Sequence, residues 1–203
     1  MASIQKDIPI DAPADHVWDA LRDFGALHTR LVPGFVTDTR LDGDVRTVSF
    51  SNGTVARETL VDCLRTQLEL TGTHAGCEMG ACGACLVQLD GRAVHACLMF
   101  AVQADGARID TIEGLSESGV IADLQAEFHR RNALQCGFCT PGMLINAHEL
   151  LSNVARPSRE AIRDALSGNF CRCTGYEAIV DAIAAVAEAR AAKAAQGAEG
   201  ASS

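Results

Sequence analysis

Apolar residues recur at different spacings along the chain, and these spacings predict a mixed fold of strands and helices. Within the first 55 residues, residues 4–10 and 36–50 have the spacing of strands, and residues 14–24 have the spacing of a helix. Asn52-Gly53 follows the second strand segment and is typical of a two-residue hairpin turn. No cysteine occurs before residue 56, so this segment differs in character from the rest of the chain.

Residues 56–117 are expected to combine one helix with short strands. An amphipathic helix is predicted from Thr59 to Leu70, with Thr59 as its N-cap and Asp62 as the capping-box partner. Its apolar face consists of Leu60, Cys63, Leu64 and Leu68. A glycine-rich loop follows, and Asp90-Gly91 then predicts a tight turn between two strands. The strands expected after the loop cover residues 84–89, 93–102 and 108–112.

Residues 118–190 have the apolar spacing of helices. Four helices are expected, around Ile121–Phe128, from Thr140-Pro141, over Ser158–Leu166 and from Thr174 to beyond Val186. Pro141 has its favoured first helical position, and Thr174 with Glu177 has the pattern of a capping box. The buried face of the last helix is expected to contain Tyr176, Ile179, Val180, Ile183 and Val186. Residues 191–203 are rich in Ala, Gly and Ser and predict a flexible tail.

The overall composition narrows the possible partners. The 203 residues have a formal net charge of -9, which argues against nucleic acid or an anionic membrane surface, because both attract a basic face. No segment is apolar enough over a sufficient length to span a bilayer, and the first residues have no signal-peptide pattern, so a cytoplasmic location is expected. Nine cysteines are many for such a chain. In a reducing compartment, grouped cysteines more often bind metal than form disulfides.

The first cysteine set lies in and just after the glycine-rich loop. It consists of Cys77, Cys82, Cys85 and Cys97. The pattern is C-x4-C-x2-C, then eleven residues and a fourth cysteine, which is the plant-type spacing for four thiolates that hold a [2Fe–2S] cluster. Gly76, Gly80 and Gly83 allow the backbone to turn tightly around the sulfurs. Cys97 is expected on the strand after the Asp90-Gly91 turn.

The second cysteine set is divided between two distant segments. It consists of Cys136, Cys139, Cys171 and Cys173. The pattern is C-x2-C, thirty-one residues, then C-x-C. Each pair precedes a predicted helix, and the positive ends of two helices favour an anionic cluster held between them.

Other uses of the cysteines remain as alternatives. Structural zinc also uses C-x2-C pairs, although the C-x4-C-x2-C and C-x-C spacings are poor matches to zinc fingers. Disulfides are favoured still less. Cys63 is left over from two complete sets, and its place on an apolar helix face favours a buried structural thiol over a ligand. The six histidines are interpreted as surface or core residues, since a Rieske centre would need two of them in place of two cysteines.

Residues 56–188 closely resemble the small iron–sulfur subunit of the xanthine oxidase and carbon monoxide dehydrogenase family of molybdenum hydroxylases. Three segments carry the resemblance: residues 70–85 (LTGTHAGCEMGACGAC), 136–143 (CGFCTPGM) and 166–176 (LSGNFCRCTGY). The resemblance implies an α+β fold. A β-grasp domain of the plant-type [2Fe–2S] ferredoxins would span residues 56–117, and a four-helix [2Fe–2S]-binding domain would span residues 118–190.

The same resemblance implies a role and partners. The chain would be a non-catalytic electron-transfer subunit of a molybdenum oxidoreductase of the carbon monoxide, aldehyde or N-heterocycle dehydrogenase type. Its partners would be a large subunit with a molybdopterin cofactor, often as the cytosine dinucleotide, and a medium subunit with FAD. Electrons would pass from molybdenum through the helical-domain cluster and the ferredoxin-domain cluster to FAD. Gln135 and Cys173 have the positions that lie against the pterin in this family.

Residues 1–55 depart from that family. Residues 8–54 resemble the opening of the START-like polyketide cyclase and lipid-transfer family, especially at 12–18 (APADHVW) and 45–53 (VRTVSFSNG). That fold needs a much longer chain, so no closed ligand pocket is expected. The simplest interpretation is a remodelled start of the gene, with a hairpin at residues 46–55 in place of the missing β-grasp strands. A fused ligand-sensing domain is the alternative.

Two further functions are weighed against the subunit: a free-standing two-cluster ferredoxin and a non-redox zinc-binding interaction module. The second cysteine set favours the subunit, because a simple carrier needs no second domain that meets a pterin. Co-purification with large and medium subunits would distinguish the subunit from the carrier. Metal analysis would identify the zinc module.

Overall fold

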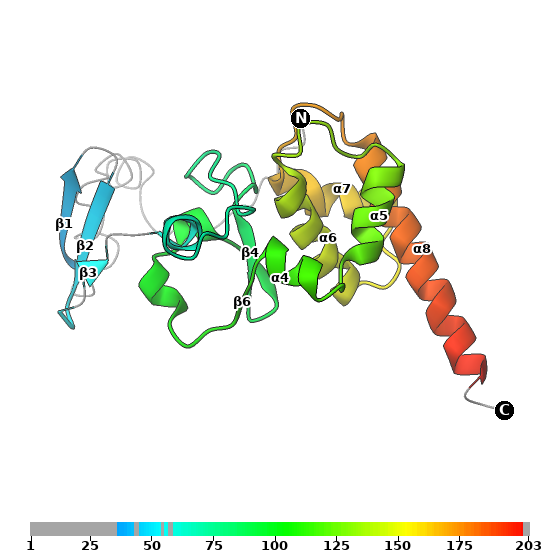
Figure 1. The fold of residues 1–203 in the computed structure, drawn as a ribbon, viewed down its shortest axis with the longest axis horizontal. Coiled ribbons are helices and arrows are strands. Elements are labelled where there is room, and N and C mark those ends of the chain that lie inside the picture. Colours follow the sequence, from blue (N-terminus) through cyan, green and yellow to red (C-terminus); the bar gives the residue numbers. More distant parts are fainter. Residues whose placement is uncertain (1–35, 43–44, 54, 57–58, 201–203) are drawn as a thin grey trace, which may run out of the picture.

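The fold combines two small sheets with a group of helices (Figure 1). The computed structural model describes residues 36–42, 45–53, 55–56 and 59–200. The strand expected at residues 4–10 and the helix expected at residues 14–24 lie outside them. The mixture of strands and helices confirms the mixed fold class, and all strands in the described part of the chain precede residue 111.

The first sheet contains three strands in sequence order: β1 (Val36–Asp42), β2 (Val45–Phe50) and β3 (Val55–Ala56). Both pairs are antiparallel, which confirms the strands predicted over 36–50. The hairpin between β2 and β3 is longer than the predicted two-residue turn, because its last paired residues are Ser49 and Val55. The Gly53 N–H donates to the Phe50 oxygen at 3.0 Å. With a φ of 83°, Gly53 closes this turn instead of standing at its centre.

The second sheet also contains three strands, in the order β5 (Arg92–His95), β4 (Leu86–Leu89) and β6 (Ile109–Asp110). Asp90 and Gly91 connect β4 to β5 as predicted, and both have positive φ (50° and 82°). β5 ends well before the predicted strand end at residue 102, and two 3-10 segments follow: η2 (Ala96–Leu98) and η3 (Ala101–Ala104). The apolar run over these residues does not distinguish a buried strand from another buried segment.

The two sheets are separate, so the β2–β3 hairpin does not supply the strands expected for the β-grasp sheet. Over the residues that the structure describes, β2 lies between β1 and β3, and both of its hydrogen-bonding edges are therefore occupied. A contact toward the second sheet joins Phe50 and Phe100, whose rings meet edge-on with centroids 6.3 Å apart. Figure 1 shows the first sheet at one end of the molecule. The expectation that residues 46–55 replace these strands is thus wrong.

The predicted helix after Thr59 begins as expected but changes its hydrogen bonding after one turn. Thr59 caps α3 (Leu60–Asp62), because its hydroxyl accepts from the Asp62 N–H at 3.3 Å and the Asp62 carboxylate accepts from the Thr59 N–H at 3.4 Å. The chain continues as a π-helix, η1 (Cys63–Gln67). A π-helix bonds i to i+5 and does not keep the α-helical spacing of side chains. Leu68, predicted on the apolar face, is therefore 57% exposed.

Helices dominate the described chain after residue 111. They are α4 (Ile112–Glu117), α5 (Ala122–Arg130), α6 (Thr140–Asn153), α7 (Arg159–Ala165) with the 3-10 segment η4 (Leu166–Gly168), and α8 (Glu177–Gly200). The four expected helices are confirmed, and α4 was not predicted. Their shared core includes the fully buried side chains Ile121, Leu124, Phe128, Met143, Ile145, Ile162, Ile179 and Ile183. In the part of the chain that is described, no helix has the length and apolar character needed to cross a membrane.

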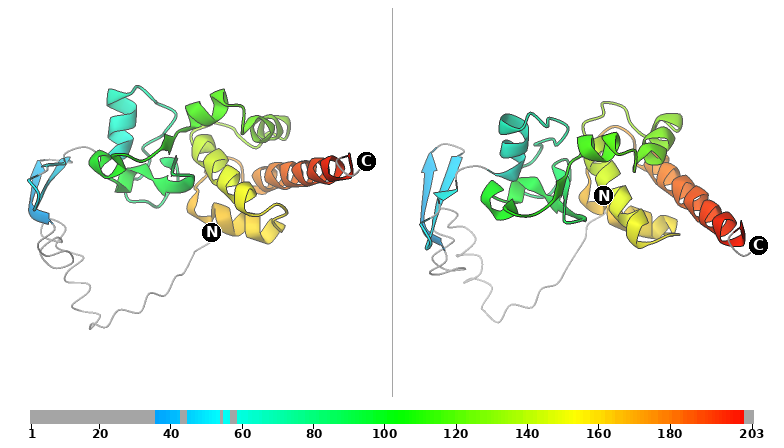
Figure 2. Two further views of the ribbon diagram at one scale, coloured as in Figure 1. Left: turned by 90° about the horizontal axis from the view of Figure 1, so that it is seen from below. Right: turned by 60° about the horizontal axis from the view of Figure 1, so that its bottom comes forward.

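α8 is longer than predicted. It runs to Gly200, so residues 191–200 of the expected tail are helical, and alanine, which dominates this stretch, is the strongest helix former. Figure 2 shows that α8 extends beyond the other helices.

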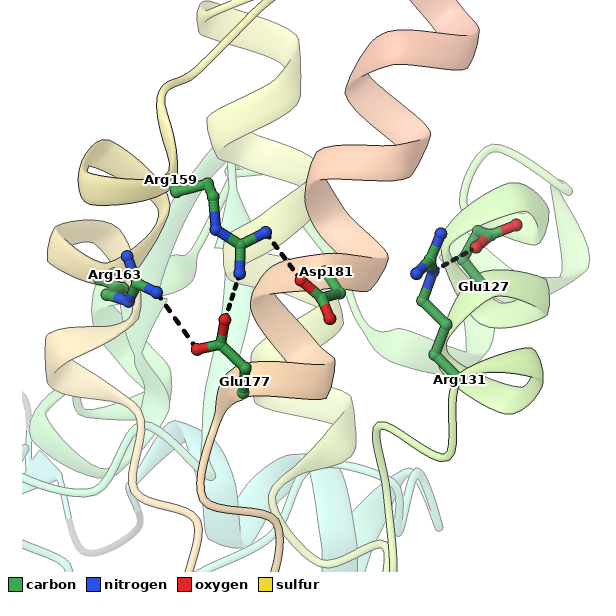
Figure 3. A network of polar contacts seen from close by, with 6 residues as sticks. All are labelled: Glu127, Arg131, Arg159, Arg163, Glu177 and Asp181. Atoms are coloured by element: carbon green, nitrogen blue, oxygen red, sulfur yellow. Dashed lines mark hydrogen bonds and ion pairs between the residues drawn. The ribbon is translucent and has the colours of Figure 1, made fainter.

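Ion pairs connect α8 with α7 and α5. Figure 3 shows Arg159 of α7 between Glu177 and Asp181 at the start of α8. The Arg159 Nη1 atom lies 2.7 Å from Asp181 Oδ1. Further along α8, Arg190 Nε lies 2.7 Å from Asp123 Oδ2 of α5. Because these pairs are partly exposed, each contributes little to the free energy of unfolding, and the apolar core supplies most of it.

Candidate metal centres

The glycine-rich loop brings the first cysteine set together. Cys77 and Cys82 lie on the loop, Cys85 ends it just before β4, and Cys97 lies in η2. The thiols form two hydrogen-bonded pairs, Cys77 with Cys82 and Cys85 with Cys97. The charges of Cys82 and Cys85 also interact. The four cysteines of this set therefore lie as two thiol pairs, and Cys97 lies in a 3-10 turn and not on the predicted strand.

Burial and backbone amides give these thiols different acidities. Burial raises the pKa of Cys77, but backbone N–H groups, which include those of Met79 and Ala81, lower it more, so its pKa falls from 9.0 to about 7. The Ala81 N–H lies 3.3 Å from Cys77 Sγ. Burial and the neighbouring Cys97 thiol raise the pKa of Cys85 from 9.0 to about 12. Amides that point at a sulfur stabilise its thiolate form, which is the form that binds metal.

Glycines allow the loop to fold this tightly. Gly80 and Gly83 have positive φ (73° and 69°), as the sequence predicts. A Cβ atom on Gly80 would lie 2.4 Å from Leu98 Cδ1. A Cβ atom on Gly76 would lie 3.1 Å from Cys82 Sγ. The backbone therefore packs more closely against the Cys82 thiol at Gly76, and against the Leu98 side chain at Gly80, than a larger residue would permit.

The second cysteine set joins two segments that are distant in the sequence. Cys139 is the N-cap residue of α6, and Cys171 and Cys173 follow η4. The Sγ atoms of Cys136 and Cys173 are 3.7 Å apart, and the Cys139 thiol is hydrogen-bonded to Cys171. Cys139 is buried, whereas Cys136 and Cys173 are exposed. This set therefore also consists of two thiol pairs, one of which faces solvent.

The C-x-C pair does not lie directly at the start of α8, and the predicted capping box is wrong. The Thr174 hydroxyl accepts from the Tyr176 N–H at 3.2 Å and donates to Cys171 Sγ at 3.2 Å. The Glu177 N–H donates to the Gly175 oxygen instead. Tyr176 has a φ of 70°, which interrupts helical geometry before Glu177. Thr174 thus stabilises a thiol and does not cap the helix.

The acidities of the second set reflect its crowding. Burial raises the pKa of Cys139 to about 12, and the neighbouring Cys171 and Cys136 thiols contribute to the rise. Burial also raises the pKa of Cys171, but hydrogen bonds, the largest from the Thr174 hydroxyl, reverse this and lower it overall. A metal that binds such a set must displace the remaining thiol protons.

The donor atoms suit a two-iron cluster. Within the described ranges, no group of three or more His, Cys, Asp or Glu residues is placed to bind a single metal ion. Each set instead presents two thiol pairs, and a [2Fe–2S] cluster takes two thiolates on each of its irons. An all-thiolate set is also the usual donor set for such clusters.

Gln135 lies beside the second set. Its side chain is exposed and donates from Nε2 to the Cys173 carbonyl oxygen at 3.0 Å. The two residues that resemble pterin contacts therefore lie together at an exposed edge. Cys63, the leftover cysteine, is half-buried and not fully buried as expected.

Two residues of this site were missed in the sequence. The Tyr176 hydroxyl accepts from the Cys171 N–H at 2.8 Å and donates to the Asn169 carbonyl oxygen at 3.0 Å. Asn169 is a polar residue that is only 2% exposed. No spacing rule identifies either contact, and the only signal is that both residues adjoin the C-x-C pair.

Two family models match the chain. The model of the [2Fe-2S] binding domain matches residues 111–184, which contain the second cysteine set. The model of the polyketide cyclase / dehydrase and lipid transport family matches residues 1–82, in agreement with the resemblance at the N-terminus. The second match extends past residue 55 and includes Cys77 and Cys82 of the first set.

Relatives of known function resemble most of the chain. It is 51% identical over 146 residues to the nicotine 6-hydroxylase small subunit of Paenarthrobacter nicotinovorans, over 72% of this chain and 86% of the relative. It is 49% identical to caffeine dehydrogenase subunit gamma of Pseudomonas sp. (strain CBB1), over 64% of this chain and 80% of the relative. A chain of quinoline 2-oxidoreductase from Pseudomonas putida 86 has a TM-score of 0.63 and 48% identity, over 71% of this chain and 88% of that chain. The protein belongs to the family of iron–sulfur small subunits of molybdenum hydroxylases and is an electron-transfer subunit of such an oxidoreductase.

Proposed function

We propose that the chain carries electrons from a molybdenum centre in a large partner subunit, through two [2Fe–2S] clusters, to FAD in a medium partner subunit. The observation that carries this proposal is the arrangement of each cysteine set as two thiol pairs. When bound, a [2Fe–2S] cluster supplies reversible one-electron transfer. The molybdopterin, as its cytosine dinucleotide, and the FAD would belong to the partners.

Each cysteine set would hold one cluster in its own domain. The proposed domains are a β-grasp ferredoxin domain at residues 56–117 and a helical domain at residues 118–190. The proposed pairs of ligands are Cys77 with Cys82, Cys85 with Cys97, Cys136 with Cys173, and Cys139 with Cys171. Hydrogen bonds from loop amides and from the Thr174 hydroxyl support thiolates in both sites.

The second set would face the molybdenum cofactor. Its Cys136–Cys173 pair is exposed, and Gln135 lies at the same edge. An exposed amide can both donate to and accept from a pterin edge. The first set would face the flavin-bearing partner, where Met79, which is 72% exposed, stands on the loop next to Glu78. A change at Glu78 or Met79 should therefore affect transfer to flavin.

Co-purification from the native host tests this proposal. Large and medium subunits should accompany the chain, and Mo(V) in the complex should couple magnetically to the cluster of the second set in rapid-freeze paramagnetic resonance. A chain that is isolated alone with both clusters would favour the alternative, a free-standing two-cluster carrier. Coupling that survives the loss of the second-set cluster, but vanishes with the first, would reverse the proposed order.

A further inference from the structure

Hydrogen bonds connect the segments that contain the two cysteine sets. The Phe170 N–H donates to the Cys82 carbonyl oxygen at 2.8 Å. The next residue of the loop and the residue before Phe170 make a second bond: Asn169 donates from Nδ2 to the Gly83 carbonyl oxygen at 3.3 Å. Cys82 belongs to the first set, and Phe170 directly precedes Cys171 of the second. A single hydrogen bond therefore lies between a cysteine of one set and the residue next to a cysteine of the other.

Asn169 is held firmly in this contact. Its side chain is 2% exposed, and Asn146 Nδ2 donates to its Oδ1 at 2.6 Å. The same Asn146 group also donates to the Ala165 oxygen at 2.7 Å. The Asn169 carbonyl accepts from the Tyr176 hydroxyl at 3.0 Å. Rotation of the buried amide would leave polar groups without partners, which is costly.

The Gly83 backbone packs closely against the Asn169 side chain and against the backbones of Gly168 and Gly142. A Cβ atom on Gly83 would lie 2.5 Å from both Asn169 Nδ2 and the Gly168 oxygen. A Cβ atom on Gly142, in the first turn of α6 after Cys139, would lie 2.0 Å from the Gly83 oxygen. Segments next to cysteines of both sets therefore meet at Gly83. An added Cβ at either glycine would force the segments that carry the two cysteine sets apart.

We propose that Asn169 is a positioning residue that sets the coupling between the two cluster sites, because it holds the Cys82 oxygen against the Phe170 N–H. This inference rests on the proposed function. The step that it serves is a one-electron exchange in which one site is oxidised as the other is reduced, and no proton moves and no bond is made or broken. The covalent path from Cys82 Sγ to Cys171 Sγ is interrupted only by this hydrogen bond. If the contact loosens, an open gap replaces the hydrogen bond, and coupling through a gap falls more steeply with distance than coupling through bonds.

Variants of the full chain with both clusters test this. Asn169→Ala removes the side-chain bond to the Gly83 oxygen, and Gly83→Ala drives the two segments apart. Asn153→Ala is the control for the first, because Asn153 is exposed and its side chain donates to the Glu149 oxygen of its own helix. Gly91→Ala is the control for the second, because Gly91 also has positive φ but has no atom within 4 Å of an added Cβ.

Three measurements are needed: iron and sulfide content, the spin–spin interaction between the two reduced clusters, and hydrogen exchange of the Phe170 amide. We expect both test variants to keep their iron and sulfide, to weaken the spin–spin interaction and to expose the Phe170 amide to exchange. Both controls should match the unchanged chain.

The inference would be overturned if both test variants kept the spin–spin interaction and the hydrogen-exchange rate of the Phe170 amide unchanged. If either variant does not load both clusters, Asn146→Ala decides, because it removes the bonds to Asn169 Oδ1 and to the Ala165 oxygen but changes no residue of the two contact segments. Unaltered coupling in that variant would also overturn the inference. An unchanged chain that contains no clusters would instead refute the proposed function, so the two failures are distinguishable.

Discussion

The side-chain amide of Gln135 donates a hydrogen bond from Nε2 to the carbonyl oxygen of Cys173 at 3.0 Å. This bond joins the residue before the C-x2-C pair to the second cysteine of the C-x-C pair, which are separated by 38 positions. It therefore connects the two segments of the second cysteine set at their exposed edge. With one Nε2 hydrogen bonded to Cys173, the amide oxygen and the second Nε2 hydrogen are the groups that the Gln135 side chain can offer to a partner's cofactor.

We predict that Gln135→Ala keeps both clusters, because it removes no thiol, but slows electron transfer from molybdenum or loosens the cofactor. Iron and sulfide analysis and the Mo(V) signal in rapid-freeze paramagnetic resonance measure the two effects. Gln125→Ala is the control, since that amide bonds to Ser116 Oγ between α4 and α5. Loss of the second cluster in Gln135→Ala would show instead that the bond to Cys173 assembles the thiols.

Metal content should follow the two cysteine sets. The intact chain should contain about four irons and about four inorganic sulfides, as two [2Fe–2S] clusters. Cys82→Ser should abolish the first cluster only, and Cys171→Ser the second only, because each removes one thiolate from one set. Cys63→Ser should retain both, since both sets are complete without it. Zinc in place of iron, with no sulfide, would contradict the assignment.

The N-terminal segment should not be needed for cluster binding. We expect deletion of residues 1–43 to leave both clusters and partner binding intact, because the sheet β5-β4-β6 and both cysteine sets lie outside the deleted part. The Phe50–Phe100 contact would also remain. Absorbance of the clusters and co-purification of the partners measure the result. If the truncated chain lost the first cluster, the N-terminal segment would be a structural part of that domain.

The cluster-free chain should lose stability in alkali. The pKa values of Cys85 and Cys139 are raised from 9.0 to about 12, chiefly by burial. The folded chain therefore keeps two protons that the unfolded chain releases above pH 9. This contribution is fully present below pH 9 and is lost as the pH rises toward about 12. Urea unfolding of the cluster-free chain at a series of pH values measures it.

The matched variant for this experiment removes the two thiols together. Cys85→Ala with Cys139→Ala should give a flatter stability profile above pH 9 than the unchanged chain. A chain with bound clusters should also lack this loss, because its ligands are already thiolates. Identical profiles for the variant and the unchanged cluster-free chain would show that other groups control alkaline unfolding.

Predictions from short spacings were confirmed where the interaction is local. Pro141, predicted at the first helical position, is the second residue of α6, but the capping box of Thr59 and Asp62 forms and Asp90-Gly91 makes its two-residue turn. In each case the interacting atoms belong to residues only a few positions apart. Their geometry is therefore set by backbone conformation and depends little on distant packing.

Predictions that depended on continuing a regular pattern failed at its ends. Leu68 has the α-helical spacing of its apolar neighbours but is exposed, because the chain has changed to a π-helix. β5 ends at His95, although the apolar run continues into η2. Thr174 has the spacing of a cap but bonds to Cys171 Sγ instead. In each place the chain adopts another local structure that the apolar or capping pattern does not distinguish.

The sequence by itself determined which thiols belong to each set and which family the chain resembles, because the C-x4-C-x2-C, C-x2-C and C-x-C spacings are local and specific. Only the tertiary structure decided that Cys136 pairs with Cys173 and that Asn169 reaches the Gly83 oxygen across 86 positions. It also decided that the β2–β3 hairpin belongs to a separate sheet. The physical reason is that these contacts join segments far apart in the chain. Their distance and direction follow from how the loops and helices pack, which no periodicity within either segment records.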